Sequence, residues 1–262
     1  MTLLETRART GAMARVNPVA KLVASALIAI PLILTLDMVS AAVALALEGV
    51  LFLFAGIGWR EFWARTWPVW LAAPLTGVTI ALYGETGGRI HFEWLLVHVS
   101  DGSLALAGAT VLRVLAIALP SVVLFVTVDP TDLADGLGQT MRLPARFVLG
   151  ALAGLRMVGL FLDDWRALEL ARRARGVADR GRIRRFLGMA FALLVLSIRR
   201  GAKLSTAMEA RGFGAPVRRT WARQARFGWQ EWMLVLAGAA ISAVAIVAAV
   251  ATGAWNFILG PA

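Results

Sequence analysis

The stretch LALAGATVLRVLAIALPSVVLFVTVDPTD, residues 104–132, decides the fold class. Its first part, Leu104–Val128, is almost wholly apolar and contains no acidic residue. About 20 such residues are enough for a helix to cross the hydrocarbon core of a bilayer. The stretch then ends on Asp129 and Pro130, a helix-capping residue followed by the residue that best tolerates a first helical turn. We therefore predict a membrane-spanning helix that is followed at once by a second helix.

The composition of the whole chain agrees with this prediction. The chain has 262 residues, of which 59% are hydrophobic and 16% charged, and its mean hydropathy is +0.74. A soluble domain is about half apolar and about a quarter charged. The hydrophobicity excludes a disordered basic tail, and such long apolar runs disfavour a nucleic-acid-binding domain. The absence of cysteine excludes disulfides, thiolate metal sites and a cysteine nucleophile.

Four further apolar segments predict spans on either side of this one. We expect an all-α, polytopic membrane protein with about five transmembrane helices and long cytoplasmic coupling helices. Pro74 is expected to kink the third span, and the outer loop Gly84–Ser103 to form an interfacial or re-entrant piece. The four segments are Leu22–Leu36, Val39–Ile57, Val69–Tyr83 and Trp232–Leu259.

Basic residues predict the orientation of these spans. The net charge is +11, and Lys21 and Lys203 are the only lysines, so nearly all of the positive charge is arginine. Nineteen basic residues lie between Arg142 and Arg226, whereas Arg89 is the single one between the third and fourth spans. Since cytoplasmic loops are enriched in lysine and arginine, we expect the N-terminus and the region 129–228 to be cytoplasmic. The localisation expected is the cell membrane of a prokaryote.

This pattern divides the chain into three predicted regions. Residues 1–128 hold about four N-terminal spans, residues 129–228 form cytoplasmic or interfacial coupling helices, and residues 229–262 hold the last span. In the middle region, Pro144 separates the short helix after Asp129 from a long helix at Ala145–Ala174. A further helix is expected at Ile183–Ala210, whose apolar run is too short to cross a bilayer.

The two long helices of the middle region end on the same tripeptide. The first ends in ELARRARG at residues 169–176, and the second in MEARGF at residues 208–213. Taken singly, each is an ordinary helix end, with glycine at the position that needs a left-handed backbone and arginine near the negative end of the dipole. The repetition favours a shared binding role, because a guanidinium is a rigid fork of donors and small neighbours permit close approach.

At this point the chain resembles the transmembrane coupling subunit, the T component, of energy-coupling factor (ECF) transporters, a group that includes the cobalt-type permease subunit. The resemblance covers about Asn17 to Gly214, and the ordered pair of Arg-Gly motifs is its specific part. Arg172 departs from the glutamine that is frequent in the family. The residues that match family positions are Asn17, Pro18, Lys21, Asp129, Pro130, Asp132, Pro144, Arg156, Ala174, Arg175, Gly176, Ala210, Arg211 and Gly212.

The resemblance implies a scaffold for an ATP-driven importer of vitamins or transition-metal ions. Its expected partners are two cytoplasmic ABC-type ATPases, a small substrate-binding (S) membrane subunit and the lipid bilayer, with no nucleic acid. Arg175 and Arg211 are the expected coupling arginines. We expect no cofactor or metal on this chain, with ATP and Mg²⁺ held by the ATPases. The chain itself contains no P-loop, because Ala20 and Ala202 precede its two lysines where that motif requires glycine.

Parts of the sequence are compatible with two other functions. Asp129, Asp132 and Asp135 have the spacing of an acidic cluster that holds Mg²⁺ on a diphosphate, as in a membrane prenyltransferase, with Asp163 and Asp164 as a second pair. A self-sufficient secondary transporter is the other alternative. A metal site at His91, Glu93 and His98 is disfavoured, since histidines in such a loop are usually solvated. The partner of Arg113 inside its span is left open between Glu48 and another acid.

Overall fold

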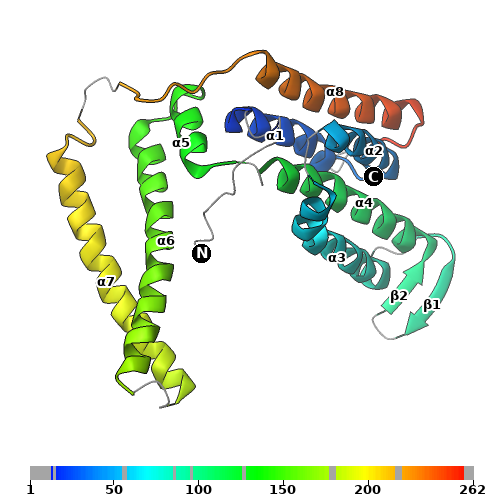
Figure 1. Cartoon of the computed structure of the whole chain (residues 1–262). Coiled ribbons are helices and arrows are strands. Elements are labelled where there is room, and N and C mark those ends of the chain that lie inside the picture. The colour runs from blue at the N-terminus through cyan, green and yellow to red at the C-terminus, as the bar shows by residue number, and fades with distance from the viewer. Residues whose placement is uncertain are drawn as a thin grey trace. The chain divides into compact units, whose positions relative to one another are not determined.

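A computed structural model describes residues 13, 16–54, 58–84, 87–94, 97–125, 128–176, 181–215 and 220–256. In this part of the chain there are eight helices and one two-stranded hairpin, so the predicted all-α membrane class is confirmed. The chain divides into two compact units. The first contains described residues up to Leu133 together with those from Ala225 onward, and the second contains Ala134–Gln224. Figure 1 shows the helices and strands of both units.

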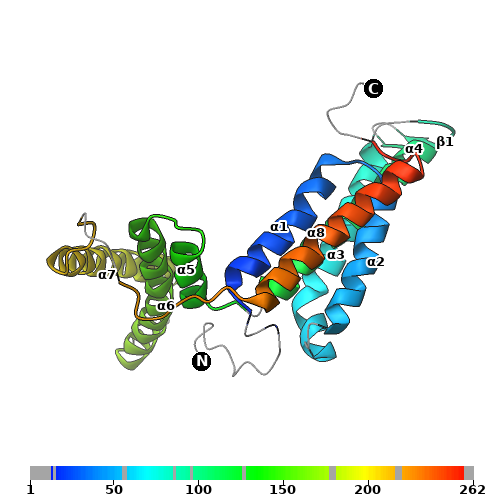
Figure 2. The same cartoon turned by 90° about the horizontal axis from the view of Figure 1, so that it is seen from above.

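The first unit is a bundle of the five helices that the apolar segments predict. α4 packs against α1, α2 and α3, while α8 packs against α1 and α2, and Figure 2 shows these helices side by side. By length and composition α4 and α8 are apolar enough to cross a membrane, and α1 and α2 are shorter apolar helices. The five helices are α1 (Pro18–Leu34), α2 (Met38–Phe54), α3 (Trp59–Tyr83), α4 (Asp101–Phe125) and α8 (Trp229–Ala251).

Small residues let these helices approach closely. Gly238 on α8 faces α1 so tightly that a Cβ atom there would lie 2.9 Å from the carbonyl oxygen of Ala24. Gly77 on α3 is packed in the same way against Val111 on α4. Lipid supplies no hydrophobic driving force between helices, so such van der Waals contact is what holds them together. The largest core cluster joins four helices and contains Ile28, Leu32, Ala44, Ala116, Ile241 and Ala245.

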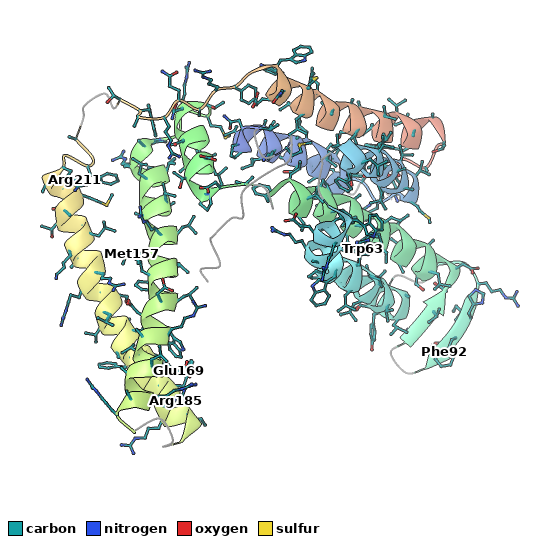
Figure 3. The ribbon with its side chains drawn as sticks, in the orientation of Figure 1. Trp63, Phe92, Met157, Glu169, Arg185 and Arg211 are labelled. Atoms are coloured by element: carbon teal, nitrogen blue, oxygen red, sulfur yellow. The ribbon has the colours of Figure 1, made fainter. Side chains whose placement is uncertain are left out.

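α3 differs most from its predicted span. It begins at Trp59, ten residues before the expected Val69, and continues through Pro68 and Pro74 as one helix. The charged residues of its first turns lower the mean hydropathy there, so hydropathy alone does not predict this start. Glu61 and Arg65 nevertheless form an i,i+4 ion pair of 2.9 Å, which is typical of a helix. This N-terminal half carries Trp63, which Figure 3 labels.

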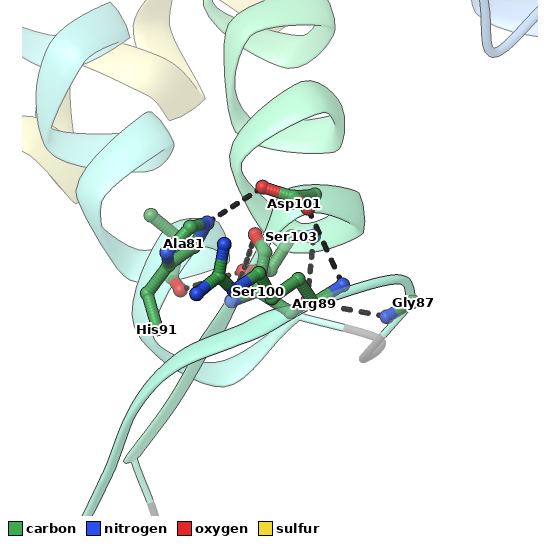
Figure 4. A network of polar contacts seen from close by, with 7 residues as sticks. All are labelled: Ala81, Gly87, Arg89, His91, Ser100, Asp101 and Ser103. Atoms are coloured by element: carbon green, nitrogen blue, oxygen red, sulfur yellow. Dashed lines mark hydrogen bonds and ion pairs between the residues drawn. The ribbon is translucent and has the colours of Figure 1, made fainter.

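A β-hairpin connects α3 and α4 where an interfacial or re-entrant piece was predicted. β1 (Ile90–Trp94) pairs antiparallel with β2 (Val97–Ser100). Side chains tie its base to the helices (Figure 4): His91 Nε2 lies 2.6 Å from Asp101 Oδ1, and Ser103 Oγ donates to the carbonyl oxygen of Ala81. The alternation of apolar and polar residues at 90–94 is the signal for a strand that the sequence interpretation missed.

A buried network of hydrogen bonds joins the beginnings of α1 and α8. The Asn17 side chain caps α1 by accepting from Val19 N, and its Nδ2 donates to the carbonyl oxygen of Arg226. Asn17 N donates to Glu231 Oε1 at 3.1 Å, and Gly228 N donates to Glu231 Oε2 at 2.8 Å. Both oxygens of this buried carboxylate therefore accept a backbone N–H, and the two helix starts are fixed together.

Two other buried charged side chains of the bundle lack such bonds. Glu48 on α2 is completely buried, and neither of its oxygens has a hydrogen-bond partner among the described residues. Arg113 on α4 likewise has a buried Nε and Nη2 without such partners. Asp37, the residue before α2, is an acid within electrostatic reach of Arg113. Asp37 also accepts from the backbone N–H and the hydroxyl of Ser40.

The second unit is formed by two long helices and the end of a short one. α5 (Pro130–Gln139) reaches this unit from Ala134 onward, and α6 (Ala145–Ala174) and α7 (Arg182–Ala210) follow it. The predicted break at Pro144 is confirmed, since Pro144 precedes the first residue of α6. By length and composition α6 also qualifies as a membrane span. The assignment of 129–228 to the cytoplasmic side thus stays a prediction.

The two buried glutamates of the bundle provide a stability test. Glu231→Gln removes one acceptor for a backbone N–H, and we expect it to cost about 1–3 kcal/mol. Glu48→Gln breaks no hydrogen bond to a described residue and relieves the burial of an ionisable group, so we expect a change of no more than about 1 kcal/mol. Thermal unfolding in mild detergent measures both. A Glu48→Gln variant that unfolds as early as Glu231→Gln would contradict this account.

Candidate functional site

The end of α6 places Arg175 at a helix terminus. Arg175 N donates to the carbonyl oxygen of Ala171, and Gly176 N donates to that of Arg173, which closes the last turn. Gly176 then has φ +66°, in the left-handed region that favours glycine. Such a residue stops the helix, and the guanidinium of Arg175 is left on the last turn.

The end of α7 repeats this geometry at Arg211. Gly212 N donates to the carbonyl oxygen of Glu209, and Phe213 N donates to that of Met208. Gly212 has φ +70°, so the predicted glycine stop is confirmed at both helix ends. In each case the residue before the arginine is an exposed alanine, Ala174 or Ala210.

Both arginines are exposed and unpaired. In the described part of the chain, neither the Arg175 nor the Arg211 guanidinium makes a hydrogen bond or an ion pair, while other arginines of the same helices are paired through their side chains. A Cβ placed on Gly176 or on Gly212 would have no atom within 4 Å, so the surroundings of both motifs are open. The two forks of donors are therefore available to a partner.

The two helix ends lie far apart, because they are at opposite ends of α7. Glu169, near the end of α6, forms an ion pair of 2.5 Å with Arg185, near the beginning of α7 (Figure 3). The first motif follows Glu169 by two turns of helix, whereas Arg211 follows the last residue of α7. With a rise of 1.5 Å per residue, the 29 residues of α7 are about 43 Å long.

Ion pairs and one aromatic contact connect α6 to α7. Arg200 on α7 holds Asp164 on α6 through two contacts, Nη2 to Oδ1 at 2.9 Å and Nη1 to Oδ2 at 2.6 Å. Trp165 and Phe186 pack with their ring centroids 5.6 Å apart. An open cavity beside the Glu169–Arg185 pair is lined by Trp165, Glu169, Arg185, Phe186 and Met189. Because α6 is otherwise scarcely covered, these pairs are its principal link to α7.

Arg172, the residue that departs from the family pattern, lies over α7 and not at the tip. A Cβ placed on Gly188 would come within 3.1 Å of Arg172 Nη2. Gly188 thus provides the space in which this guanidinium rests. The departure therefore affects the contact between the two helices and leaves the Ala-Arg-Gly tripeptide unchanged.

The other motif residues occupy structural positions. Asn17, Pro18 and Lys21 belong to the buried start of α1. Asp129 Oδ1 accepts from Thr131 N at 2.8 Å, so its predicted capping role is confirmed, with Pro130 as the first residue of α5. Arg156 lies exposed on α6. Asn17, Pro18, Asp129 and Pro130 thus lie at the starts of helices, whereas Arg156 lies within α6.

The acidic residues do not assemble into the alternative site. Asp163 lies 3.6 Å from Arg166, and Asp164 is held by Arg200, so both are occupied by arginine. Among the described residues no three histidine, cysteine or acidic side chains are placed to hold a metal ion. On the hairpin, His98 faces Glu93 at 3.4 Å, while His91 faces Asp101. The geometry thus favours the arginine tips as the functional site.

The chain is similar to a family of known membrane transport proteins. A model of the CbiQ cobalt transport protein family matches residues 11–221 of the chain. The energy-coupling factor transporter transmembrane protein EcfT of Limosilactobacillus fermentum is 27% identical over 191 residues, covering 68% of this chain and 71% of the relative. EcfT of Brevibacillus brevis is 25% identical, covering 72% and 73%. EcfT of Lactobacillus helveticus is 28% identical, covering 69% and 68%.

Two glycines of the second helix test the geometry of the tip. Gly212→Ala forces a side chain into a left-handed conformation, at a cost of about 1–2 kcal/mol. Gly201→Ala, in the middle of α7 and equally open, should stabilise the helix by about 0.5–1 kcal/mol. Hydrogen exchange of the last turn of α7 should be faster in the first variant and slower in the second. Equal protection in both variants would show that the left-handed stop is dispensable.

Proposed function

Because the chain belongs to the CbiQ cobalt transport protein family, we propose that it couples two cytoplasmic ATPases to a substrate-binding membrane protein. The chain is a non-catalytic transmembrane component of an energy-coupling factor transporter. The finer proposal assigns one ATPase to Arg175 and the other to Arg211. It also places both tips on the cytoplasmic side of a prokaryotic cell membrane, as the distribution of basic residues favours.

The observation that carries this proposal is the pair of exposed, unpaired guanidiniums at opposite ends of α7. A single docking site would need one arginine, whereas tips at opposite ends of a helix about 43 Å long suit two separate partners. Each guanidinium offers five N–H donors in a planar fork, which matches a carboxylate or the free carbonyl groups at a helix end. The alanine and glycine beside each arginine let the backbone of an ATPase approach without hindrance.

The energy for transport comes, in this proposal, from ATP and Mg²⁺ on the ATPases. Lys21 and Lys203 each follow an alanine, so neither stands in the Gly-Lys pair of a phosphate-binding loop. When the two ATPases close, they would draw the tips of α6 and α7 along. The ion pairs Glu169–Arg185 and Asp164–Arg200 keep the two helices together during that motion.

The apolar surface of α6 and α7 is suited to contact with the membrane partner. Both helices expose large hydrophobic side chains along much of their length, including Phe147, Leu155, Val158, Ile183, Phe186, Phe191 and Ile198. Such a surface exceeds what a soluble helix pair tolerates, so it is suited to lipid or to another membrane protein. We propose that the small substrate-binding subunit packs here, and that this subunit selects the vitamin or transition-metal ion.

The arginine tips are tested by the number of ATPases bound. Complexes purified in mild detergent should contain two ATPases per chain in the wild type, one in Arg211→Ala or Arg175→Ala, and none in the double variant. The physical reason is that each docking site loses its only charged fork. Quantitative mass spectrometry of the purified complexes measures this ratio.

Arg199→Ala is the matched control for that experiment. Arg199 is exposed on α7 and has no partner among the described residues, yet it lies away from both tips. It should keep two ATPases per chain. A double tip variant that retains both ATPases would refute the arginine-tip assignment. Uptake by the chain alone in proteoliposomes would instead favour the secondary transporter.

The ion pairs between the helices are tested by separating ATP hydrolysis from uptake. Asp164→Asn with Glu169→Gln weakens both cross-helix pairs and leaves the two tips intact. We expect ATPases to bind and hydrolyse ATP at near the wild-type rate, while coupled uptake in proteoliposomes falls about tenfold, because the helices no longer move as one lever. Asp163→Asn, which touches only the exposed pair with Arg166, is the control. Unchanged uptake in the double variant would contradict the hypothesis that these ion pairs make α6 and α7 move together.

A further inference from the structure

Four tryptophans form a single stripe on the N-terminal half of α3. Trp59, Trp63, Trp67 and Trp70 are spaced by four, four and three residues, which places them on one side of a helix. All four are exposed, Trp59 by 74% and Trp67 by 59%. The ring centroids of Trp59 and Trp63 are 5.6 Å apart, and those of Trp63 and Trp70 are 5.4 Å apart. The stripe is thus an ordered aromatic surface, with Trp63 in its middle (Figure 3).

The stripe is too long for an ordinary aromatic belt. From Trp59 to Trp70 the helix rises about 16 Å. The polar interface on each side of a bilayer is only about 5–8 Å thick, as the difference between total and hydrocarbon thickness shows. If Trp59 anchors at the interface of an upright helix, Trp70 lies well inside the hydrocarbon region. The aromatic surface therefore extends from the headgroups down to the acyl chains.

A cation lies at the shallow end of this surface. Arg60 is exposed, and its guanidinium has neither a hydrogen bond nor an ion pair in the described part of the chain. It is three residues before Trp63 and seven before Trp67, so it shares their side of the helix. Arg65 differs, because its guanidinium is neutralised by Glu61 at 2.9 Å. Arg60 is thus the positive charge at this end that is available to an anion.

The deep end of the surface is aliphatic. Leu71, Leu75 and Val78 continue along α3 and are exposed by 64%, 67% and 54%. The order along the helix is therefore a guanidinium, a set of indole rings and then aliphatic side chains. This order matches the phosphate, the glycerol ester region and the acyl chains of one phospholipid molecule.

We propose that α3 binds an anionic phospholipid, with its phosphate on Arg60 and its acyl chains along the tryptophan stripe and Leu71–Val78. The indole N–H groups are placed to donate to ester oxygens, because tryptophan has one polar atom on an apolar ring. The charge at Arg60 favours a lipid with net negative charge, such as phosphatidylglycerol, over a zwitterionic one. It also favours lipid over an apolar face of another protein, which would leave Arg60 buried and unpaired.

Lipid retention by the full complex tests this site. Complexes purified from nanodiscs of phosphatidylcholine and phosphatidylglycerol, 7:3, are examined by native mass spectrometry. The wild type should retain phosphatidylglycerol preferentially, and Arg60→Gln should reduce its retention about fivefold relative to phosphatidylcholine. Arg65→Gln is the matched control, since Arg65 is one turn away but already paired, and it should retain phosphatidylglycerol as the wild type does.

Two further variants examine the aromatic part of the site. Trp63→Leu with Trp67→Leu should lower the retention of both lipids, because it shortens the surface along which acyl chains lie. Equal retention of the two lipids by the wild type, or undiminished phosphatidylglycerol in Arg60→Gln, would overturn the proposal. So would loss of the substrate-binding subunit from the tryptophan variant with lipid retention unchanged. ATPase copurification by Arg60→Gln, expected to be normal, separates this result from the test of the arginine tips.

Discussion

The bundle depends on the carboxylate of Glu231, which accepts backbone N–H groups from Asn17 and Gly228. Residues 17 and 231 are 214 positions apart, so this contact brings the last helix back beside the first. Close packing then becomes possible between α1 and α8, where Gly238 lies against Ala24. A carboxylate at such a depth is tolerated because both of its oxygens are satisfied by hydrogen bonds.

The second unit is held together by different interactions. α6 and α7 bury little of their surface and are linked chiefly by ion pairs, while their ends leave arginines without partners. Charges that remain unpaired and exposed contribute nothing to the stability of the isolated chain, so their repetition at two helix ends suits binding. The proposed coupling role would benefit from such a unit, because sparsely packed helices are free to shift against each other.

Several features of the fold are predictable from local patterns of residues. Apolar runs of 15 residues or more indicate the five spans, and Asp129-Pro130, Pro144 and the two Arg-Gly ends indicate where helices begin and stop. The beginning of α3 and the β-hairpin are not predicted. In the first case charged residues lower the hydropathy, although Glu61 and Arg65 pair along the helix. In the second, the strands are only five and four residues long, and pairing with each other is what makes them strands.

The sequence by itself thus determined the membrane class, the order of the helices and the positions of the two helix ends at Gly176 and Gly212, because these depend on composition and on neighbours within a few residues. Only the tertiary structure decided which polar groups meet across the fold. It joined Asn17 to Glu231, placed Asp37 within electrostatic reach of Arg113, and laid Arg172 over Gly188. It also left Arg175, Arg211 and Arg60 without partners among the described residues. The physical reason is that a hydrogen bond or ion pair requires two side chains within a few ångströms, and spacing along a chain does not specify distance between helices.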